Sequence, residues 1–233
     1  MKVFFKGFNF SQDGPGNRLV SHLQGCNMRC PWCSNPEGMV RTGGSEISVS
    51  ALVAEAKGCL PMFFSGGGVT FTGGEATLQC DELCEALRLL RAAGIHTALE
   101  TNGVSPSLPV IEKQVDYLMM DVKHFDADLF LSFTGQPIDA LRDNLTYLCG
   151  IGRQLHIRIP VINGVNADDA LGFVSFFSGL DTQNAVFELL PYHEYGKEKW
   201  KGRYGFKNGF VSDVQLDLFR ETLVRHGLKV IHT

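Results

Sequence analysis

The chain has 233 residues, 44% of them hydrophobic and 20% charged, and its formal net charge is −4. This composition is typical of a globular protein with one sizeable core, and we expect a single domain spanning residues 1–233. A slightly acidic chain gives no electrostatic reason to bind nucleic acid or an anionic membrane, and no stretch is apolar enough to span a membrane.

The first part of the chain predicts strands that lead into a cysteine-rich loop. Residues 2–10 are rich in aromatic residues and favour a strand, and residues 13–17 (DGPGN) have the residue types of a turn. Residues 18–24 predict a short strand that runs into the loop. The N-terminal residues lack an apolar run of secretory length, and an odd number of cysteines is typical of reduced thiols, so we expect a cytoplasmic protein.

Strands and helices alternate in the rest of the chain. Further strands are expected at 68–72, 96–100, 117–122, 155–162 and 185–190, with a short one at 229–232. Helices are expected at 49–57, 81–93, 138–149, 167–177 and after Ser212, where Gln215 completes a capping box. Strand–helix units repeated about six times predict an α/β fold with a parallel sheet and outer helices. We expect an open partial TIM barrel, about (β/α)6, in preference to a flat doubly wound sheet.

The most informative stretch is the cysteine loop, where Cys26, Cys30 and Cys33 have the spacing C-x3-C-x2-C. The next cysteine is Cys59, so no fourth thiol lies nearby. Three thiolates can hold three irons of a [4Fe–4S] cluster and leave the fourth iron open to a ligand. The spacing alone also allows a structural zinc site with a distant fourth ligand, or three unrelated thiols.

Polar residues follow several of the predicted strands, at the edge where parallel sheets carry their chemistry. They are Gly73-Gly74-Glu75, Thr101-Asn102-Gly103, Asp121 with Lys123, and His193. A second set offers the oxygen ligands that hard cations prefer, from Glu100, Thr101, Met119 and Asp121. Arg158 lies inside an apolar strand, so it must pair with another group or face a polar cavity.

Two further groups have a weaker signal. Cys80 and Cys84 are four residues apart on a predicted helix, where they could face each other as a second metal or redox site. The basic residues Lys197, Lys199, Lys201 and Arg203 favour a solvated loop over a binding patch.

These segments, taken in order, resemble the radical SAM (S-adenosylmethionine) superfamily and, within it, the activating enzymes of glycyl radical enzymes. The resemblance rests on the turn at 13–16, the cysteine triplet with Trp32 before its last cysteine, and several short stretches. These are GGVT (67–70), GGEA (73–76), TNG (101–103), DVK (121–123), and LLPYH (189–193) with Gly196-Lys197 and Lys199-Trp200. The last stretch is most similar to the branch that acts on pyruvate formate-lyase. Many members carry a cysteine-rich, ferredoxin-like insert before GGVT, and this chain does not.

The resemblance implies a reaction and a set of site residues. The enzyme would reductively cleave SAM at a [4Fe–4S] cluster and abstract a hydrogen atom from a glycine Cα of a partner glycyl radical enzyme, under anaerobic conditions. An electron donor such as flavodoxin or ferredoxin would reduce the cluster, and neither nucleic acid nor membrane would be a partner. A radical SAM enzyme acting on a small molecule and a non-catalytic zinc-binding module are the competing hypotheses.

The implied site residues fall into four groups. Cys26, Cys30 and Cys33 would hold the cluster. SAM would be bound by Trp32, Gly73, Gly74, Glu75, Asp121, Lys123 and His193. A monovalent cation, Na⁺ or K⁺, would lie on Glu100, Thr101, Met119 and Asp121. Asp13 and Arg158 would contact the glycine loop of the partner.

Overall fold

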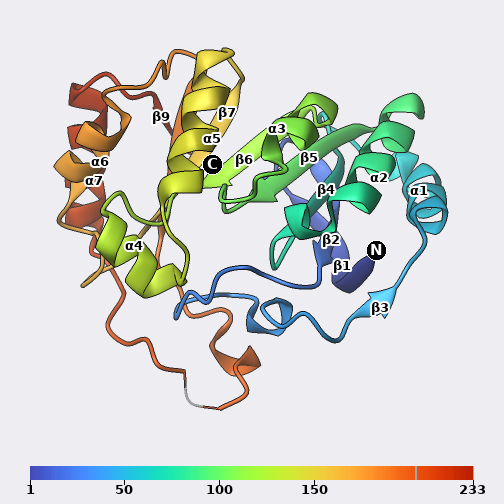
Figure 1. Ribbon diagram of the computed structural model, residues 1–233, viewed down its shortest axis with the longest axis horizontal. Helices are drawn as coiled ribbons and strands as arrows, with labels where there is room; N and C mark the ends of the chain where they lie inside the picture. The colour runs from blue at the N-terminus through green and yellow to red at the C-terminus, as the bar shows by residue number, and fades with distance from the viewer. Residues whose placement is uncertain (203, 233) are drawn as a thin grey trace. The chain divides into compact units, whose positions relative to one another are not determined.

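The computed structural model describes residues 1–202 and 204–232 (Figure 1). The chain divides into two compact units. The first unit comprises Met1–Asn27, Asn35–Thr101 and Ser105–Met119, and the second comprises Met28–Ser34, Asn102–Val104 and Met120–Thr233. Strand β6 (Tyr117–Asp121) is divided between them. The single domain expected from the composition stays a prediction.

The sheet of the first unit has the strand order β3-β1-β2-β4-β5. Strand β1 (Lys2–Phe10) runs antiparallel to β2 (Asn17–Leu23) and, through Lys2 and Val3, to β3 (Ser45–Glu46). Strands β2, β4 (Gly68–Gly73) and β5 (His96–Thr101) are parallel, as expected. Their carboxyl ends therefore lie at one edge, where Cys26 and the Gly73–Glu75 segment leave the sheet.

The helices of the first unit are α1 (Val49–Gly58), α2 (Cys80–Ala92) and the short α3 (Leu108–Ile111). Helix α1 begins at Ser48, whose hydroxyl accepts a hydrogen bond from the Ala51 amide at 3.1 Å. On α2, Leu83, Leu87 and Leu90 are fully buried and form the apolar face of this helix. Burial of each such side chain stabilises the fold by about 2 kcal/mol relative to exposure.

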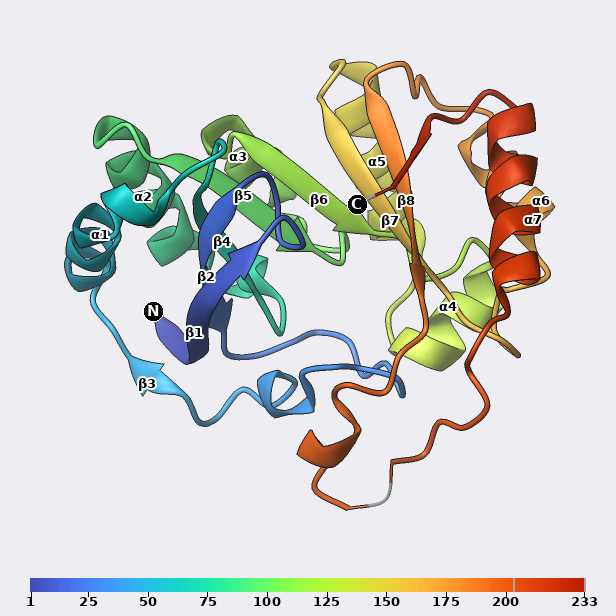
Figure 2. The same cartoon turned by 180° about the vertical axis from the view of Figure 1, so that it is seen from behind.

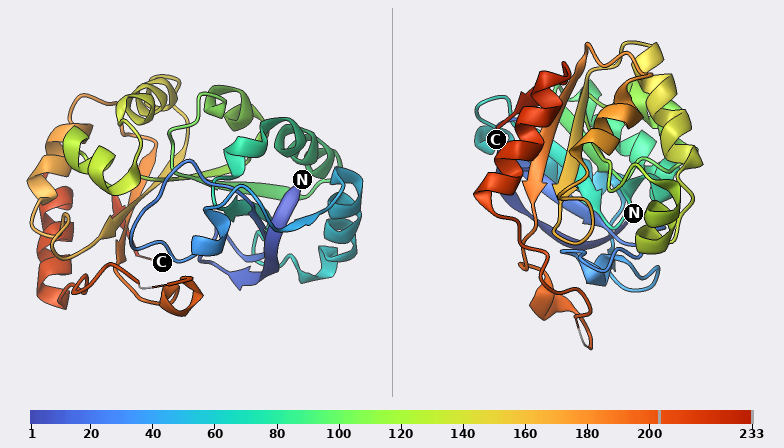
Figure 3. Two further views of the ribbon diagram at one scale, coloured as in Figure 1. Left: turned by 60° about the horizontal axis from the view of Figure 1, so that its bottom comes forward. Right: turned by 90° about the vertical axis from the view of Figure 1, so that its left-hand side faces the viewer.

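The second unit contains the parallel strands β7 (Leu155–Val161), β8 (Ala185–Pro191) and β9 (Val230–Ile231). Its helices are α4 (Ala127–Thr134), α5 (Asp139–Gly150), α6 (Ala170–Phe177) and α7 (Asp213–Arg225). Helices α6 and α7 lie side by side (Figures 2 and 3), with the rings of Phe173 and Phe219 5.6 Å apart. Helix α7 begins with the predicted capping box of Ser212 and Gln215.

The six strands expected to be parallel appear as β2, β4, β5, β6, β7 and β8. Helix α4 was not expected; it begins at Asp126, whose carboxylate accepts from two backbone amides, and ends at Gly135, which has a φ of 77°. Helix α6 begins at Ala170 instead of Ala167, because Asn166 closes a turn by accepting from the Ile162 amide at 2.8 Å. Short 3₁₀ helices complete the structure: η1 (Pro36–Gly38), η2 (Leu60–Met62), η3 (Ala76–Gln79), η4 (Glu112–Gln114) and η5 (Lys197–Lys199).

The helices of the described residues are too short or too polar for any of them to cross a membrane. Of the basic residues noted above, Arg203 lies outside the described residues.

Candidate active site

The cysteine loop begins in the first unit with Cys26. Gly25, with a φ of 100°, turns the chain at the end of β2. The amides of Gly25 and Cys26 donate to the carbonyls of Gly38 at 2.9 Å and Met39 at 3.3 Å. The backbone of the first predicted ligand is therefore held by the loop around η1.

The other two cysteines lie in the second unit, on a short turn in which the Cys33 amide donates to the Cys30 carbonyl at 3.2 Å. Arg29 anchors this turn through its amide, which donates to the Thr134 carbonyl at 2.9 Å. Trp32 is buried against the rings of two residues, Phe133 at 5.3 Å and Phe206 at 5.5 Å. The predicted ligands Cys30 and Cys33 are thus presented on a turn that is fixed at both ends.

All seven cysteines are thiols and none is in a disulfide. In neither unit, among the described residues, are three His, Cys, Asp or Glu side chains gathered as a metal site. The predicted set draws on both units, so its use as one ligand set stays a prediction. The donor chemistry fits an iron–sulfur cluster, because cysteine thiolates are the ligands that such clusters take.

The Gly73-Gly74-Glu75 segment follows β4 in the first unit. Gly73 has a φ of 122°, and a Cβ on Gly74 would collide with the carbonyl oxygens of Gly25 and Gly38. Glycine is required at both positions, because no other residue allows this conformation and this close backbone approach. The Glu75 amide donates to the Gly25 carbonyl at 2.7 Å, which ties the segment to the residue preceding Cys26.

The carboxylate of Glu75 is almost fully buried and serves as the N-cap of η3. Its Oε1 accepts from the Thr77 hydroxyl at 2.5 Å, the Thr77 amide at 3.2 Å and the Thr101 hydroxyl at 2.7 Å. The structure therefore brings together one predicted SAM-binding residue and one predicted cation ligand, Glu75 and Thr101. Neither role is tested by these contacts.

Asp121 and Lys123, which are half-buried, and Arg158, which is buried, form a charged network in the second unit. Lys123 Nζ lies 3.1 Å from Asp121 Oδ2, and Arg158 Nε lies 2.9 Å from Asp121 Oδ1. Burial by itself raises the pKa of Asp121, but the positive charges of Arg158 and Lys123 outweigh burial and lower the pKa to about 2. Arg158 was expected to pair with another group or to face a polar cavity, and it pairs with Asp121.

Lys123 is linked electrostatically to the cysteine turn. Burial lowers the pKa of Lys123, but the charge of Asp121 and those of Cys30 and Cys33 outweigh this effect and hold the pKa above its usual value. Lys123 therefore places a positive charge that interacts with Cys30 and Cys33. The roles of Asp121 and Lys123 in SAM binding stay predictions.

The predicted cation ligands are divided between the units. Glu100, Thr101 and Met119 belong to the first unit and Asp121 to the second. Thr101 and Met119 are buried, and Glu100 is half-buried. A cation site that uses all four residues stays a prediction.

The turn that carries Asp13 is held by Arg18, a residue that the sequence analysis missed. Arg18 is completely buried and donates to Thr70 Oγ1 at 2.5 Å, the Pro15 carbonyl at 2.9 Å and the Val69 carbonyl at 2.7 Å. Burial lowers the pKa of Arg18 to about 10. Asp13 contributes its backbone carbonyl, which accepts from Thr70 Oγ1 at 2.7 Å. A charged residue in an apolar strand was the available signal, the same one that drew attention to Arg158.

Arg158 and Asp13 were both expected to contact a partner's glycine loop. Arg158 is 5% exposed and committed through Nε to Asp121. Asp13 is half-buried, and its carboxylate accepts from Asn9 Nδ2. Contact of either residue with a partner stays a prediction. His193, the last predicted SAM-binding residue, is half-buried and stacks on Tyr195 with ring centroids 4.2 Å apart; burial lowers its pKa.

Two further cysteines, Cys80 and Cys84, lie on α2 with their sulfur atoms 4.0 Å apart. The expectation that they face each other is confirmed. Burial and the neighbouring Cys80 raise the pKa of Cys84 to about 11, so this thiol stays protonated near neutral pH.

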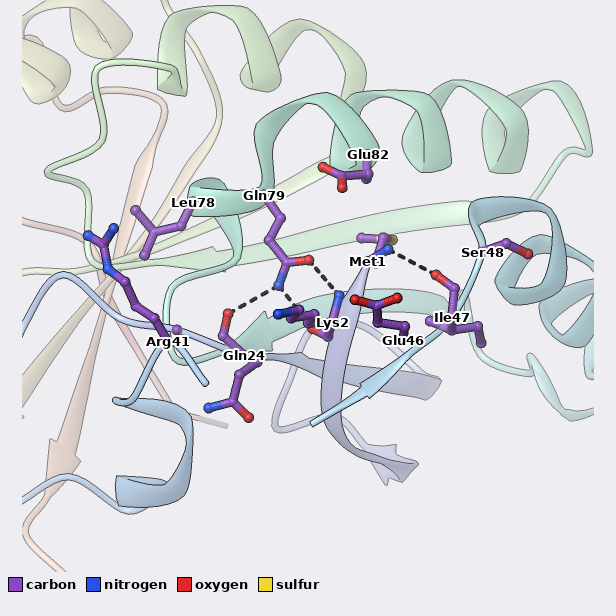
Figure 4. Close-up of a pocket in the computed structure, with 11 residues that line it drawn as sticks. Met1, Lys2, Gln24, Arg41, Glu46, Ile47, Ser48, Leu78, Gln79 and Glu82 are labelled. Carbon is purple, nitrogen blue, oxygen red and sulfur yellow. Dashed lines mark hydrogen bonds between the residues drawn. The ribbon is translucent and has the colours of Figure 1, made fainter. Parts of the chain in front are cut away.

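A cavity of about 630 Å³ lies in the first unit (Figure 4). Gln79 spans one wall: its Oε1 accepts from the Lys2 amide at 2.7 Å, and its Nε2 donates to the carbonyls of Lys2 and Gln24. The remaining lining residues are Met1, Gly25, Arg41, Glu46, Ile47, Ser48, Leu78 and Glu82. Only Gly25 adjoins a predicted ligand, so the cavity is not part of the predicted site.

Comparison with known proteins places these features in a family. The profile of the radical SAM superfamily matches residues 20–177. A pyruvate formate-lyase-activating enzyme of Staphylococcus epidermidis is 34% identical over 201 residues, which cover 81% of this chain and 80% of that protein.

Solved structures agree with this result. A domain of pyruvate formate-lyase-activating enzyme from Bacteroides vulgatus superposes with a TM-score of 0.61 at 28% identity, covering 71% of this chain and 98% of that one. Coproporphyrinogen III oxidase (HemN) from Escherichia coli, a radical SAM enzyme, superposes with a TM-score of 0.55 at 18% identity, covering 89% of this chain and 52% of that one, which shows a shared fold. The expected α/β fold with an open, mostly parallel sheet is confirmed.

Proposed function

Because the chain belongs to the radical SAM superfamily and, within it, to the family of pyruvate formate-lyase-activating enzymes, we propose that it activates a glycyl radical enzyme of the pyruvate formate-lyase kind. The reaction is reductive cleavage of SAM coupled to removal of a hydrogen atom from a glycine Cα of that partner. The observation that carries the proposal is the 34% identity over 81% of the chain to a protein named for this activity. A zinc-binding module has no support from these relatives.

The proposed cluster ligands are Cys26, Cys30 and Cys33. When bound, the [4Fe–4S] cluster supplies the one-electron chemistry that cleaves SAM. The chain's part is to hold the ligands on fixed backbone and to keep a positive charge at Lys123 that interacts with two of the thiols.

The proposed SAM site uses residues from both units. Glu75 is a buried carboxylate that can accept from the ammonium group of SAM, and Gly73 and Gly74 let the backbone approach it. Asp121, Lys123 and His193 offer one acceptor, one cation and one imidazole for the polar groups of SAM, and Trp32 offers an aromatic wall.

A monovalent cation on Glu100, Thr101, Met119 and Asp121 is also part of the proposal. The ligands would be oxygen atoms of carboxylates, a hydroxyl and backbone carbonyls, which hard cations prefer. Protein stripped of both ions and assayed in sodium or potassium salts tests it. SAM cleavage should be restored by one of the ions, and equal activity without either ion would contradict the cation site.

Asp13 and Arg158 are proposed to contact the partner's glycine loop. Glycine suits such a loop, because without a Cβ it can enter a narrow site. The electron donor is proposed to be a protein such as flavodoxin or ferredoxin, and the setting an anaerobic cytoplasm.

The decisive test is anaerobic reconstitution followed by three measurements. Iron analysis should give about four irons per chain, and dithionite with SAM should yield 5′-deoxyadenosine. Electron paramagnetic resonance of the partner should then show a doublet from the remaining glycine α-hydrogen. A partner in which that glycine is alanine is the matched control. SAM cleavage without a radical on any glycyl radical enzyme would favour a small-molecule substrate.

A further inference from the structure

The segment between β8 and α7 is unusually basic. Residues 194–202 and 204–207, which we call the basic segment, contain four Lys residues and two Glu residues, in a chain with a net charge of −4. It lies in the connection between β8 and α7 and contains η5 (Figure 2). Lys197, Lys199, Lys201 and Lys207 are exposed, and Arg203 lies outside the described residues. Positive charge is therefore concentrated on one loop of an acidic protein.

The basic segment is attached to the cysteine turn of the same unit. Trp200 Nε1 donates to the Cys33 carbonyl at 3.1 Å, across 167 residues of sequence. Gly196 lies so close to the backbone of Ser34 that a Cβ there would collide with it. Phe206 packs edge-on against Trp32, with ring centroids 5.5 Å apart. These three contacts therefore hold the basic segment against the residues around Cys33.

A merely solvated loop does not require this arrangement. Lys197 is paired with Glu194 at 2.8 Å, whereas Lys201 and Lys207 have no ion pair with any described residue. Tyr195 is 85% exposed, and tyrosine is among the residues enriched where proteins associate. The segment thus presents unneutralised positive charge and an aromatic ring, and its inner side touches a cluster ligand.

We propose that the basic segment is the docking surface for an acidic one-electron carrier protein that reduces the cluster. This inference rests on the proposed function. Charge complementarity selects the partner: the basic segment attracts a negatively charged protein surface, whereas the rest of the chain, which is acidic, repels it. Docking on this segment brings the carrier next to the backbone of Cys33, and electron transfer requires such proximity. The carrier is oxidised by one electron, the cluster is reduced by one, and no bond or proton is exchanged.

The test compares two double variants of the reconstituted protein that change the net charge equally. Lys201→Glu with Lys207→Glu alters the basic segment, and Lys113→Glu with Lys229→Glu alters exposed lysines elsewhere. The probe is a flavodoxin of net negative charge, titrated at low and at high ionic strength. We expect the first variant to weaken flavodoxin binding about tenfold at low ionic strength, and salt to remove the difference from wild type. The control variant should bind like wild type.

Cluster reduction provides the second readout. With reduced flavodoxin as donor, the first variant should reduce its cluster and form 5′-deoxyadenosine about tenfold more slowly at subsaturating flavodoxin. With dithionite as donor it should match wild type. Unchanged flavodoxin binding would overturn the inference, and so would equal losses in both double variants. A loss of glycyl radical formation with dithionite would assign the surface to the glycyl radical enzyme instead. Wild-type protein that fails to cleave SAM with dithionite would contradict the proposed function and not the docking surface.

Discussion

The two units bury charge in opposite ways. In the first unit, Arg18 donates to carbonyls and a hydroxyl, with the charges of Asp13 and Asp116 also acting on it. Glu75 accepts from hydroxyls and a backbone amide. In the second unit, Asp121 lies between two cations, Lys123 and Arg158. A charge held by neutral dipoles can be replaced by a polar isostere at modest cost, whereas removal of one member of a buried ionic network leaves its partners uncompensated. The comparison therefore predicts where neutral substitutions are tolerated.

The largest expected effect tests whether both units supply cluster ligands. Cys26→Ala in the first unit, and Cys30→Ala or Cys33→Ala in the second, should each lower dithionite-driven SAM cleavage at least about a hundredfold, because each removes a ligand. Iron content measures the cause directly. Cys59→Ala and Cys149→Ala are matched controls from the two units and should retain the cluster, as should Cys80→Ala and Cys84→Ala. A dependence on any of these four would break the three-ligand assignment.

The next effect compares isosteric changes of one carboxylate in each unit. Asp121→Asn leaves Lys123 and Arg158 without their shared anion and should lower the free energy of unfolding by about 3 kcal/mol. Glu75→Gln keeps an oxygen for Thr77 and Thr101 and should lower it by about 1 kcal/mol. Urea unfolding of the apoproteins at neutral pH measures both. Equal losses in the two variants would refute the comparison.

A third prediction concerns Arg18 alone. Arg18→Met leaves the carbonyls of Pro15 and Val69 without their hydrogen-bond donor, which destabilises the fold. It also removes the cost of burying a charge, so we expect the unfolding free energy to fall by only about 2 kcal/mol. Arg18→Lys should recover part of this loss, because an ammonium group can replace some of the donors. A loss with Lys as large as that with Met would mean that the guanidinium shape, and not its donors, holds the turn.

The smallest effect is a pH dependence of stability that originates at His124, in the second unit. The ring is buried; its Nδ1 accepts from the Asp126 amide at 3.0 Å, and its Nε2 lies 3.2 Å from the Val165 carbonyl. Burial lowers the pKa of His124 below its usual 6.5, so the folded state binds this proton less readily than the unfolded state. Its contribution to stability is present above the unfolded pKa and declines as pH falls below it.

His124→Asn should make the unfolding free energy less dependent on pH between about 7 and 5, measured by urea titration at several pH values. The change should be partial, because burial also lowers the pKa of His96 and His193. An unaltered pH profile would show that His124 does not contribute.

Much of this protein could be predicted from short stretches of its sequence. The six parallel strands follow from runs of apolar residues separated by helix-forming segments. The predicted cluster ligands follow from three cysteines within eight residues. The pair Gly73-Gly74 indicates a position where the backbone closely approaches another group, because residues with a Cβ would not fit there. Helix α4 could also have been found, since Asp126 and Gly135 bound it as ordinary caps.

Only the tertiary structure decided which distant residues meet. Asp121 and Arg158 are 37 positions apart, Arg18 and Thr70 are 52 apart, and Trp200 and Cys33 are 167 apart. A sequence pattern shows that a charge in an apolar strand needs a partner, but the choice of that partner depends on strand order and register. Those are set by the burial of the whole core, which is a property of the folded chain and not of any local stretch.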